Sequence, residues 1–161
     1  MTGRFRLLAV WALATATIGA LVACDSGPGR EGDVGNGAEP DQALVEEALE
    51  FGRIVLPPSA VVLGAETEKG IDLLYCLAVR VAPGDVDRML SDSGFTAELE
   101  PGRQVFMPTV AGVELGNADR IASAQDTIRS GNGAERYVSR VVLVDRTDPD
   151  APVVHLWLFT T

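Results

Sequence analysis

The sequence predicts an α+β domain, in which a small antiparallel sheet of about four strands, arranged as two hairpins, carries two or three helices on one face. Three observations lead to this fold class. Apolar residues recur at helical spacing just after residue 41, two strand-like runs flank a turn near residue 70, and two more flank a turn near residue 147. The domain is expected to span residues 41–161.

The first expected helix runs from Asp41 to about Phe51. The Asp41 side chain can cap the first turn, and from Leu44 onward apolar residues recur at i, i+1, i+4 and i+5, with glutamates on the other face. We expect Gly52 to end the helix, because glycine adopts the left-handed conformation of a helix C-terminus without strain.

A β-hairpin is expected next, with strands over residues 60–66 and 71–81 around a turn at residues 68–70. In the second strand the odd-numbered residues are all apolar or aromatic. The even-numbered residues are mixed, with charged residues at both ends of the strand. This alternation predicts a sheet that is covered mainly on one side.

A second helix is expected over residues 83–93. Pro83 suits its first turn, Gly94 suits a left-handed cap, and Phe95 suits the hydrophobic contact just beyond that cap. The pattern weakens between residues 96 and 135, where Ile121 to Ile128 are expected to form a weak helix.

The C-terminal residues predict the second hairpin, with strands over 137–144 and 153–160 joined by a turn rich in aspartate. Trp157 and Phe159 share one face of the last strand with His155. Core packing is the favoured role of the two aromatic rings, and a platform for a ligand is the alternative.

The N-terminus has the pattern of a secretory signal. Arg4 and Arg6 form a positively charged segment, and residues 7–23 carry no charge. A membrane-spanning helix is the alternative interpretation, since this uncharged stretch is near the lower limit of about 17 residues for crossing a bilayer.

This stretch ends in Leu21-Val22-Ala23-Cys24, which resembles the lipobox of bacterial lipoproteins. The resemblance implies that a signal peptidase recognises Leu21, Val22 and Ala23 and cleaves before Cys24. It also implies that the Cys24 thiol carries diacylglycerol and that its amine becomes the new N-terminus. Two acyl chains hold a protein stably on a bilayer, whereas one binds only marginally.

Three regions are therefore expected: a signal peptide over residues 1–23, the lipidated cysteine with a flexible tether over residues 24–40, and the domain over residues 41–161. The tether is rich in Gly and Pro and too poor in apolar residues to order itself. The expected location is the cell membrane, facing outside the cytoplasm, with the lipid bilayer as a partner. Because arginine far outnumbers lysine, the chain resembles small uncharacterised actinobacterial lipoproteins.

The charge of the chain argues against nucleic acid as a partner. The formal net charge is −10, and it becomes −12 once Arg4 and Arg6 leave with the signal peptide. Phosphate neutralisation needs a basic patch, and the basic residues here are few and dispersed. Lipid therefore has to hold the domain at the membrane without help from electrostatic attraction.

A few residues invite a chemical interpretation, and a structural one is favoured for each. His155 is the single histidine, and a catalytic base would need a nucleophile nearby, so a hydrogen-bonded histidine within a strand is expected instead. A zinc site normally takes four ligands, and Cys76 is the one other soft ligand in the domain. Asp145, Asp148 and Asp150 lack the glycine and terminal glutamate of a calcium-binding EF-hand loop. No metal or other cofactor is expected besides the diacylglycerol.

Two functional hypotheses follow from these observations. The favoured one is a non-catalytic lipoprotein whose domain binds an envelope protein or peptide, because no catalytic set of residues stands out. The alternative is an enzyme of the cell envelope that uses carboxylates, such as Glu66, Asp72 and Glu114, on a cell-wall substrate.

Overall fold

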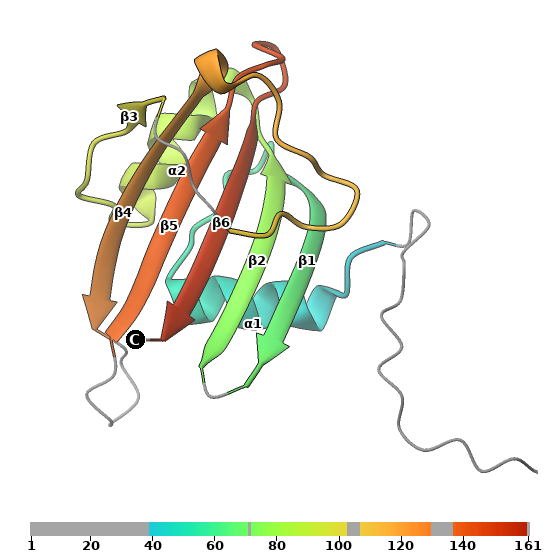
Figure 1. Cartoon of the computed structure of the whole chain (residues 1–161), viewed down its shortest axis with the longest axis vertical. Helices are drawn as coiled ribbons and strands as arrows, with labels where there is room; N and C mark the ends of the chain where they lie inside the picture. Colours follow the sequence, from blue (N-terminus) through green and yellow to red (C-terminus); the bar gives the residue numbers. More distant parts are fainter. Residues whose placement is uncertain (1–38, 71, 103–106, 130–136, 161) are drawn as a thin grey trace, which may run out of the picture. The chain divides into compact units, whose positions relative to one another are not determined.

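A computed structural model of the chain describes residues 39–70, 72–102, 107–129 and 137–160 (Figure 1). It is an α+β fold with a six-stranded antiparallel sheet and two helices packed on it. The elements in chain order are α1 (Gln42–Gly52), β1 (Val61–Lys69), β2 (Leu73–Arg80), α2 (Val86–Asp92), β3 (Glu100–Pro101), β4 (Ile121–Arg129), β5 (Tyr137–Asp145) and β6 (Val153–Thr160).

The strands lie in the order β1-β2-β6-β5-β4-β3. The two expected hairpins, β1–β2 and β5–β6, are present, and pairing of β2 with β6 joins them into one sheet. The expectation of about four strands was wrong, because β4 and the short β3 extend the sheet beyond β5.

The expected helix from Ile121 to Ile128 was also wrong, because these residues belong to β4. This strand pairs with β5 along its whole length, from Ile121 opposite Asp145 to Arg129 opposite Tyr137. Its apolar residues fit a helix or a strand about equally well when they are considered alone. The neighbouring β5 decides between the two, since β propensity depends strongly on the surrounding sheet.

The ends of α1 follow the expected chemistry with one shift. The Asp41 carboxylate accepts a hydrogen bond from the Ala43 amide at 3.0 Å, as expected for the N-terminal cap. At the other end Arg53, not Gly52, takes the left-handed conformation, with φ 51°. Gly52 is needed for space instead, because a Cβ there would lie 2.6 Å from Leu158 Cδ1.

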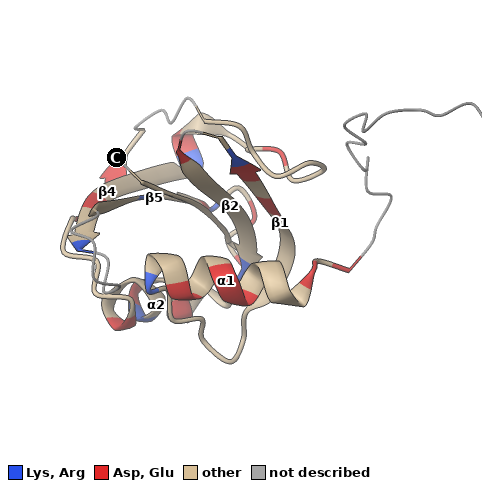
Figure 2. Ribbon diagram, turned by 90° about the horizontal axis from the view of Figure 1, so that it is seen from below, with Lys and Arg blue, Asp and Glu red and all other residues tan. Residues whose placement is uncertain are grey.

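The second helix, α2, is shorter than expected, because Pro83–Asp85 form a 3₁₀ turn before it. Gly94 has φ 66° in the left-handed cap position, as the sequence predicts. The Phe95 amide donates to the Leu90 carbonyl, and the Phe95 ring packs on the core below. Both helices lie on one face of the sheet, which curves around them (Figure 2).

The main core lies between this helical face and the two helices. Its buried strand residues come from alternate positions of the central strands, among them Leu77 of β2, Val142 of β5 and Leu156 of β6. The helices contribute Val45, Ala48, Val86, Met89 and Leu90.

The opposite face of the sheet is covered as well, so the expectation of a sheet covered mainly on one side was wrong. Residues 107–117, which we call the strap, cross the face that the helices leave free (Figure 1). Val110 of the strap is buried in a second apolar cluster with Cys76, Ala78, Val141, Leu143 and Trp157. We call this side of the sheet the strap face.

Candidate functional sites

A buried arginine lies at the centre of the helical face. Arg140 occupies an inward-facing position of β5, opposite Asp126 of β4 and Leu158 of β6, and its exposed fraction is 0%. Its Nε donates to Asp126 Oδ1 at 2.7 Å, and its Nη2 bonds the second oxygen of the same carboxylate. This two-pronged geometry is the strongest pairing of a guanidinium with a carboxylate.

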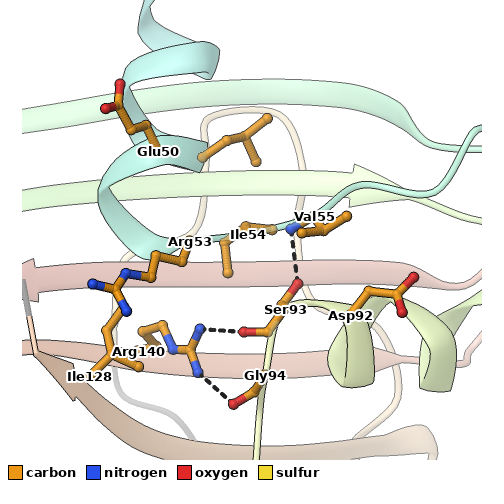
Figure 3. A pocket seen from close by; sticks show the side chains of 10 residues that line it. Glu50, Arg53, Ile54, Val55, Asp92, Ser93, Gly94, Ile128 and Arg140 are labelled. Atoms are coloured by element: carbon orange, nitrogen blue, oxygen red, sulfur yellow. Dashed lines mark hydrogen bonds between the residues drawn. The ribbon is translucent and has the colours of Figure 1, made fainter. Parts of the chain in front are cut away.

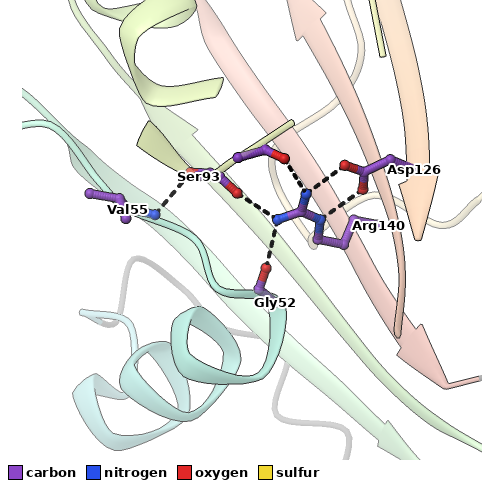
Figure 4. Close-up of polar contacts among 6 residues, drawn as sticks. Gly52, Val55, Ser93, Asp126 and Arg140 are labelled. Carbon is purple, nitrogen blue, oxygen red and sulfur yellow. Dashed lines mark hydrogen bonds and ion pairs between the residues drawn. The ribbon is translucent and has the colours of Figure 1, made fainter. Parts of the chain in front are cut away.

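The remaining N–H groups of Arg140 reach the C-terminal ends of both helices (Figure 4). Nη1 donates to the Gly52 carbonyl at 3.1 Å and to the Ser93 carbonyl at 2.8 Å, and Nη2 donates to the Gly94 carbonyl at 3.2 Å. The guanidinium carbon also lies 4.1 Å from the centre of the Phe95 ring.

Arg140 thus makes five hydrogen bonds, as many as a guanidinium has N–H groups. The positive charge sits where carbonyl groups at helix C-termini concentrate partial negative charge. Because every donor is used within the protein, Arg140 holds the helices to the sheet and keeps no donor for a ligand.

A pocket of about 530 Å³ opens beside Arg140, between the C-terminal ends of α1 and α2 (Figure 3). Its apolar wall consists of Leu49, Ile54, Val55 and Ile128. Its charged lining is formed by exposed Glu50 and Asp92 and by Arg53, whose guanidinium donates to the Arg129 carbonyl at 2.9 Å. The Val55 amide at its edge donates to Ser93 Oγ at 2.9 Å, which ties the two helix ends together.

On the strap face, hydrogen bonds to side chains hold the strap in place. The indole Nε1 of Trp157 donates to the Pro108 carbonyl at 2.6 Å. The Ala111 amide donates to Glu66 at 2.7 Å, and the Gly116 amide donates to Asp145 at 2.6 Å. These contacts give Trp157 a structural role together with the second core cluster, in line with the expectation of core packing.

His155 lies on the same face with an exposed fraction of 1%. Within the described part of the chain, neither of its ring nitrogens has a hydrogen-bond partner, so the expectation of a hydrogen-bonded histidine was wrong. Its cross-strand neighbours, Ala78 and Leu143, are apolar. Burial lowers the pKa of His155, and nearby Asp145 opposes this shift. Its ring stacks on that of Trp157, with 6.1 Å between ring centres and 16° between ring planes. The neutral imidazole is therefore the stable form in the folded protein.

Cys76 is a free, buried cysteine in the second cluster. Burial raises the pKa of its thiol to about 12, and Glu66 and Glu68 on the neighbouring strand add to the shift. Because the thiolate is the form that acts as a nucleophile or binds a metal, this protonated thiol is unreactive at neutral pH.

The carboxylates considered for catalysis lie on separate elements. Glu66 of β1 bonds the strap, Asp72 lies in the exposed turn between β1 and β2, and Glu114 is exposed within the strap. Among the described residues, no group of three or more His, Cys, Asp or Glu side chains is placed to hold a metal ion.

The aspartates considered for calcium have roles in the β5–β6 turn. Asp145 accepts the Thr147 amide at 2.8 Å, and Asp148 accepts the Asp150 amide at 3.0 Å. Burial alone would raise the pKa of Asp145, but the hydrogen bonds from Thr147 and Gly116 outweigh it and lower that pKa.

The residues of the expected lipidation signal, Leu21, Val22, Ala23 and Cys24, lie outside the described residues. Within the described ranges, no helix is long and apolar enough to cross a membrane.

Comparison with known proteins gives no relative. No family model matches the chain, no curated protein matches it, and no solved structure matches it.

Sequence reasoning missed Arg140 and the pocket beside it. One signal was present in the strand Val138-Ser139-Arg140-Val141-Val142, since an arginine at the same parity as buried valines faces the core. The partners of that arginine carried no comparable signal, because they are backbone carbonyls at the ends of two distant helices.

Proposed function

We propose that the protein is a lipid-anchored module on the outer side of the cell membrane, which binds a partner and performs no catalysis. The pocket beside Arg140 is the observation that supports the binding role. It combines an apolar wall with charged groups at its rim, which is the usual make-up of a ligand site. The Leu21-Val22-Ala23-Cys24 quartet supports the membrane anchor.

The apolar wall of the pocket and the acidic charge of the chain favour a partner with apolar side chains and a positive charge. Glu50 and Asp92 are both exposed at the rim, and Asp92 also pairs with Arg88 at 3.4 Å. The Arg53 guanidinium, which donates to the Arg129 carbonyl, adds a positive charge there. The chain as a whole is strongly acidic, which attracts cationic segments and speeds their encounter. A basic, apolar peptide segment of an envelope protein has this chemistry.

The binding role is tested with a defined probe. Full-length protein is titrated with a fluorescent peptide of alternating leucine and lysine, and with a matched peptide of leucine and glutamate. We expect saturable binding of the basic peptide alone, and a loss of at least about tenfold in affinity for Asp92→Lys, equivalent to about 1.4 kcal/mol.

Asp87→Lys is the matched control, because Asp87 is exposed on the same helix outside the pocket. It makes the same change in net charge, so equal losses in both variants would refute the pocket as the binding site. Failure of the basic peptide to bind would refute the proposed ligand class.

The membrane anchor has a separate test in the intact mass of the protein expressed in a bacterium. We expect loss of residues 1–23 and a gain of one diacylglycerol group, with the protein in the membrane fraction. Cys24→Ala is expected to abolish both changes, and Cys76→Ala, the matched control, to leave both unchanged. An unprocessed wild-type chain would contradict the proposal.

A further inference from the structure

The strap face holds a buried polar side chain that lies outside the proposed binding pocket, on the other side of the sheet. His155 is 1% exposed, and among the described residues nothing bonds its Nδ1 or Nε2. Its neighbours across the strands are Ala78 of β2 and Leu143 of β5, both apolar. Burying an unbonded polar group costs free energy, so such a group in a core calls for an explanation.

The strap covers the apolar cluster that lies beside this histidine. Val113 and Leu115 of the strap pack on the same cluster as Ala78 and Leu143, the cross-strand neighbours of His155. Each hydrogen bond described above between the strap and the sheet uses a side chain at one end. Segments held in this way open locally at lower free energy than strands within a ladder of backbone bonds.

We propose that His155 is the trigger of an acid-operated release, in which a proton taken up by its imidazole drives the strap off the sheet and exposes Trp157. In the closed state the imidazolium would be a buried cation with no hydrogen-bonded acceptor, and the nearby Asp145 carboxylate would offset only part of the cost of burying it. In the open state water solvates that cation. Acid therefore favours the open state.

The sign follows from linkage between protonation and opening. The pKa of His155 is lowered by burial in the closed state, and it returns toward the ordinary value near 6.5 when the strap opens. The open state then binds more protons than the closed state at pH values below about 6.5. The ratio of open to closed protein rises by up to about tenfold for each pH unit below this value, until the closed state is also protonated.

Two ionisable groups close to His155 do not titrate in this range. Asp145 on β5 has a lowered pKa, and the Cys76 thiol on β2 has a pKa of about 12. Arg80 on β2 and Glu114 in the strap are both exposed to water. His155 is thus the group on this face suited to respond between pH 7 and pH 5.

Trp157 provides a direct readout, because Trp11 is the one other tryptophan in the chain. Full-length Trp11→Phe protein is examined between pH 7.5 and pH 5 by acrylamide quenching of fluorescence and by hydrogen exchange of the strap amides. We expect quenching to rise several-fold and the strap protection factors to fall by about tenfold or more. Protection of β5 and β6 should stay constant.

Two variants test whether His155 causes the pH dependence of strap opening. His155→Leu is expected to hold the strap closed at both pH values, and His155→Gln, which keeps a polar group without a titration in this range, is expected to remove the pH dependence. Glu114→Gln is the matched control and should respond as the parent does. A pH response that survives in both His155 variants, or a parent strap that stays protected at pH 5, would overturn the proposal.

Discussion

Arg140 and His155 are buried on opposite faces of one sheet, on adjacent strands, and they differ in the hydrogen bonds that their side chains make. Arg140 has an exposed fraction of 0% and makes five hydrogen bonds. His155 has an exposed fraction of 1% and, among the described residues, makes none with its ring. The guanidinium cannot lose its charge, so its burial requires partners, whereas the imidazole is buried by staying neutral.

The two faces also differ in how their covers are attached. On the helical face, Arg140 joins the ends of α1 and α2 to β4 and β5 through one guanidinium. On the strap face, separate bonds from Glu66, Asp145 and Trp157 hold an irregular segment. We infer that the helical face is the stable part of the domain and that the strap is the part that opens first.

The largest expected effect comes from removing the guanidinium. Arg140→Met leaves the Asp126 carboxylate, whose side chain is 10% exposed, without its partner. It also leaves the carbonyls of Gly52, Ser93 and Gly94 unbonded. Breaking a buried pair in this way costs about 3–5 kcal/mol of unfolding free energy, which urea denaturation measures.

Arg88→Met is the control for that substitution, because Arg88 is exposed and forms a surface pair with Asp92 at 3.4 Å. It is expected to cost less than about 1 kcal/mol. The double variant Asp126→Leu with Arg140→Met should recover part of the loss. Equal losses for Arg88→Met and Arg140→Met would show that the helical face is not organised around Arg140.

Two glycine-to-alanine substitutions, with effects of intermediate size, compare how rigidly the helices and the strap are held against the sheet. A methyl group added at Gly52 meets Leu158 in the main core, and one added at Gly64 meets Val110 of the strap. We expect Gly52→Ala to cost about 1–3 kcal/mol in urea denaturation, as overpacking of a core does. Gly64→Ala should cost less, because the strap can lift.

Hydrogen exchange distinguishes the two glycine variants further. Gly64→Ala is expected to reduce protection of the strap amides while the strands keep theirs. If Gly64→Ala instead lowers global stability as much as Gly52→Ala, the strap belongs to the cooperative core and the contrast between the faces fails.

The smallest expected effect has the opposite sign. His155→Leu at pH 7.5 should raise the unfolding free energy by about 1 kcal/mol, because it replaces an unbonded polar group with an apolar one of similar size. Denaturation by urea at pH 7.5 and pH 5.5 should show a larger gain at the lower pH. A loss of stability at both pH values would mean that His155 contributes a bond that stabilises the fold.

Local patterns in the sequence determined the parts of the fold that depend on neighbouring residues. Alternation and turn residues predicted the hairpins β1–β2 and β5–β6, and the capping residues Asp41 and Gly94 predicted helix ends that the structure confirms. The lipidation signal at Leu21 to Cys24 is equally local, and it stays a prediction because it lies outside the described residues.

Tertiary structure alone decided which distant segments meet. The bonds of Arg140 join residues 14 to 88 positions apart, and the spacing of residues 121–129 fitted a helix until β5 lay beside them. The contact of the strap with Trp157 and the close packing of Gly52 on Leu158 also join residues that are distant in the sequence. Periodicity records how a segment repeats along its own axis, and the partner that buries it is set by packing of the whole chain.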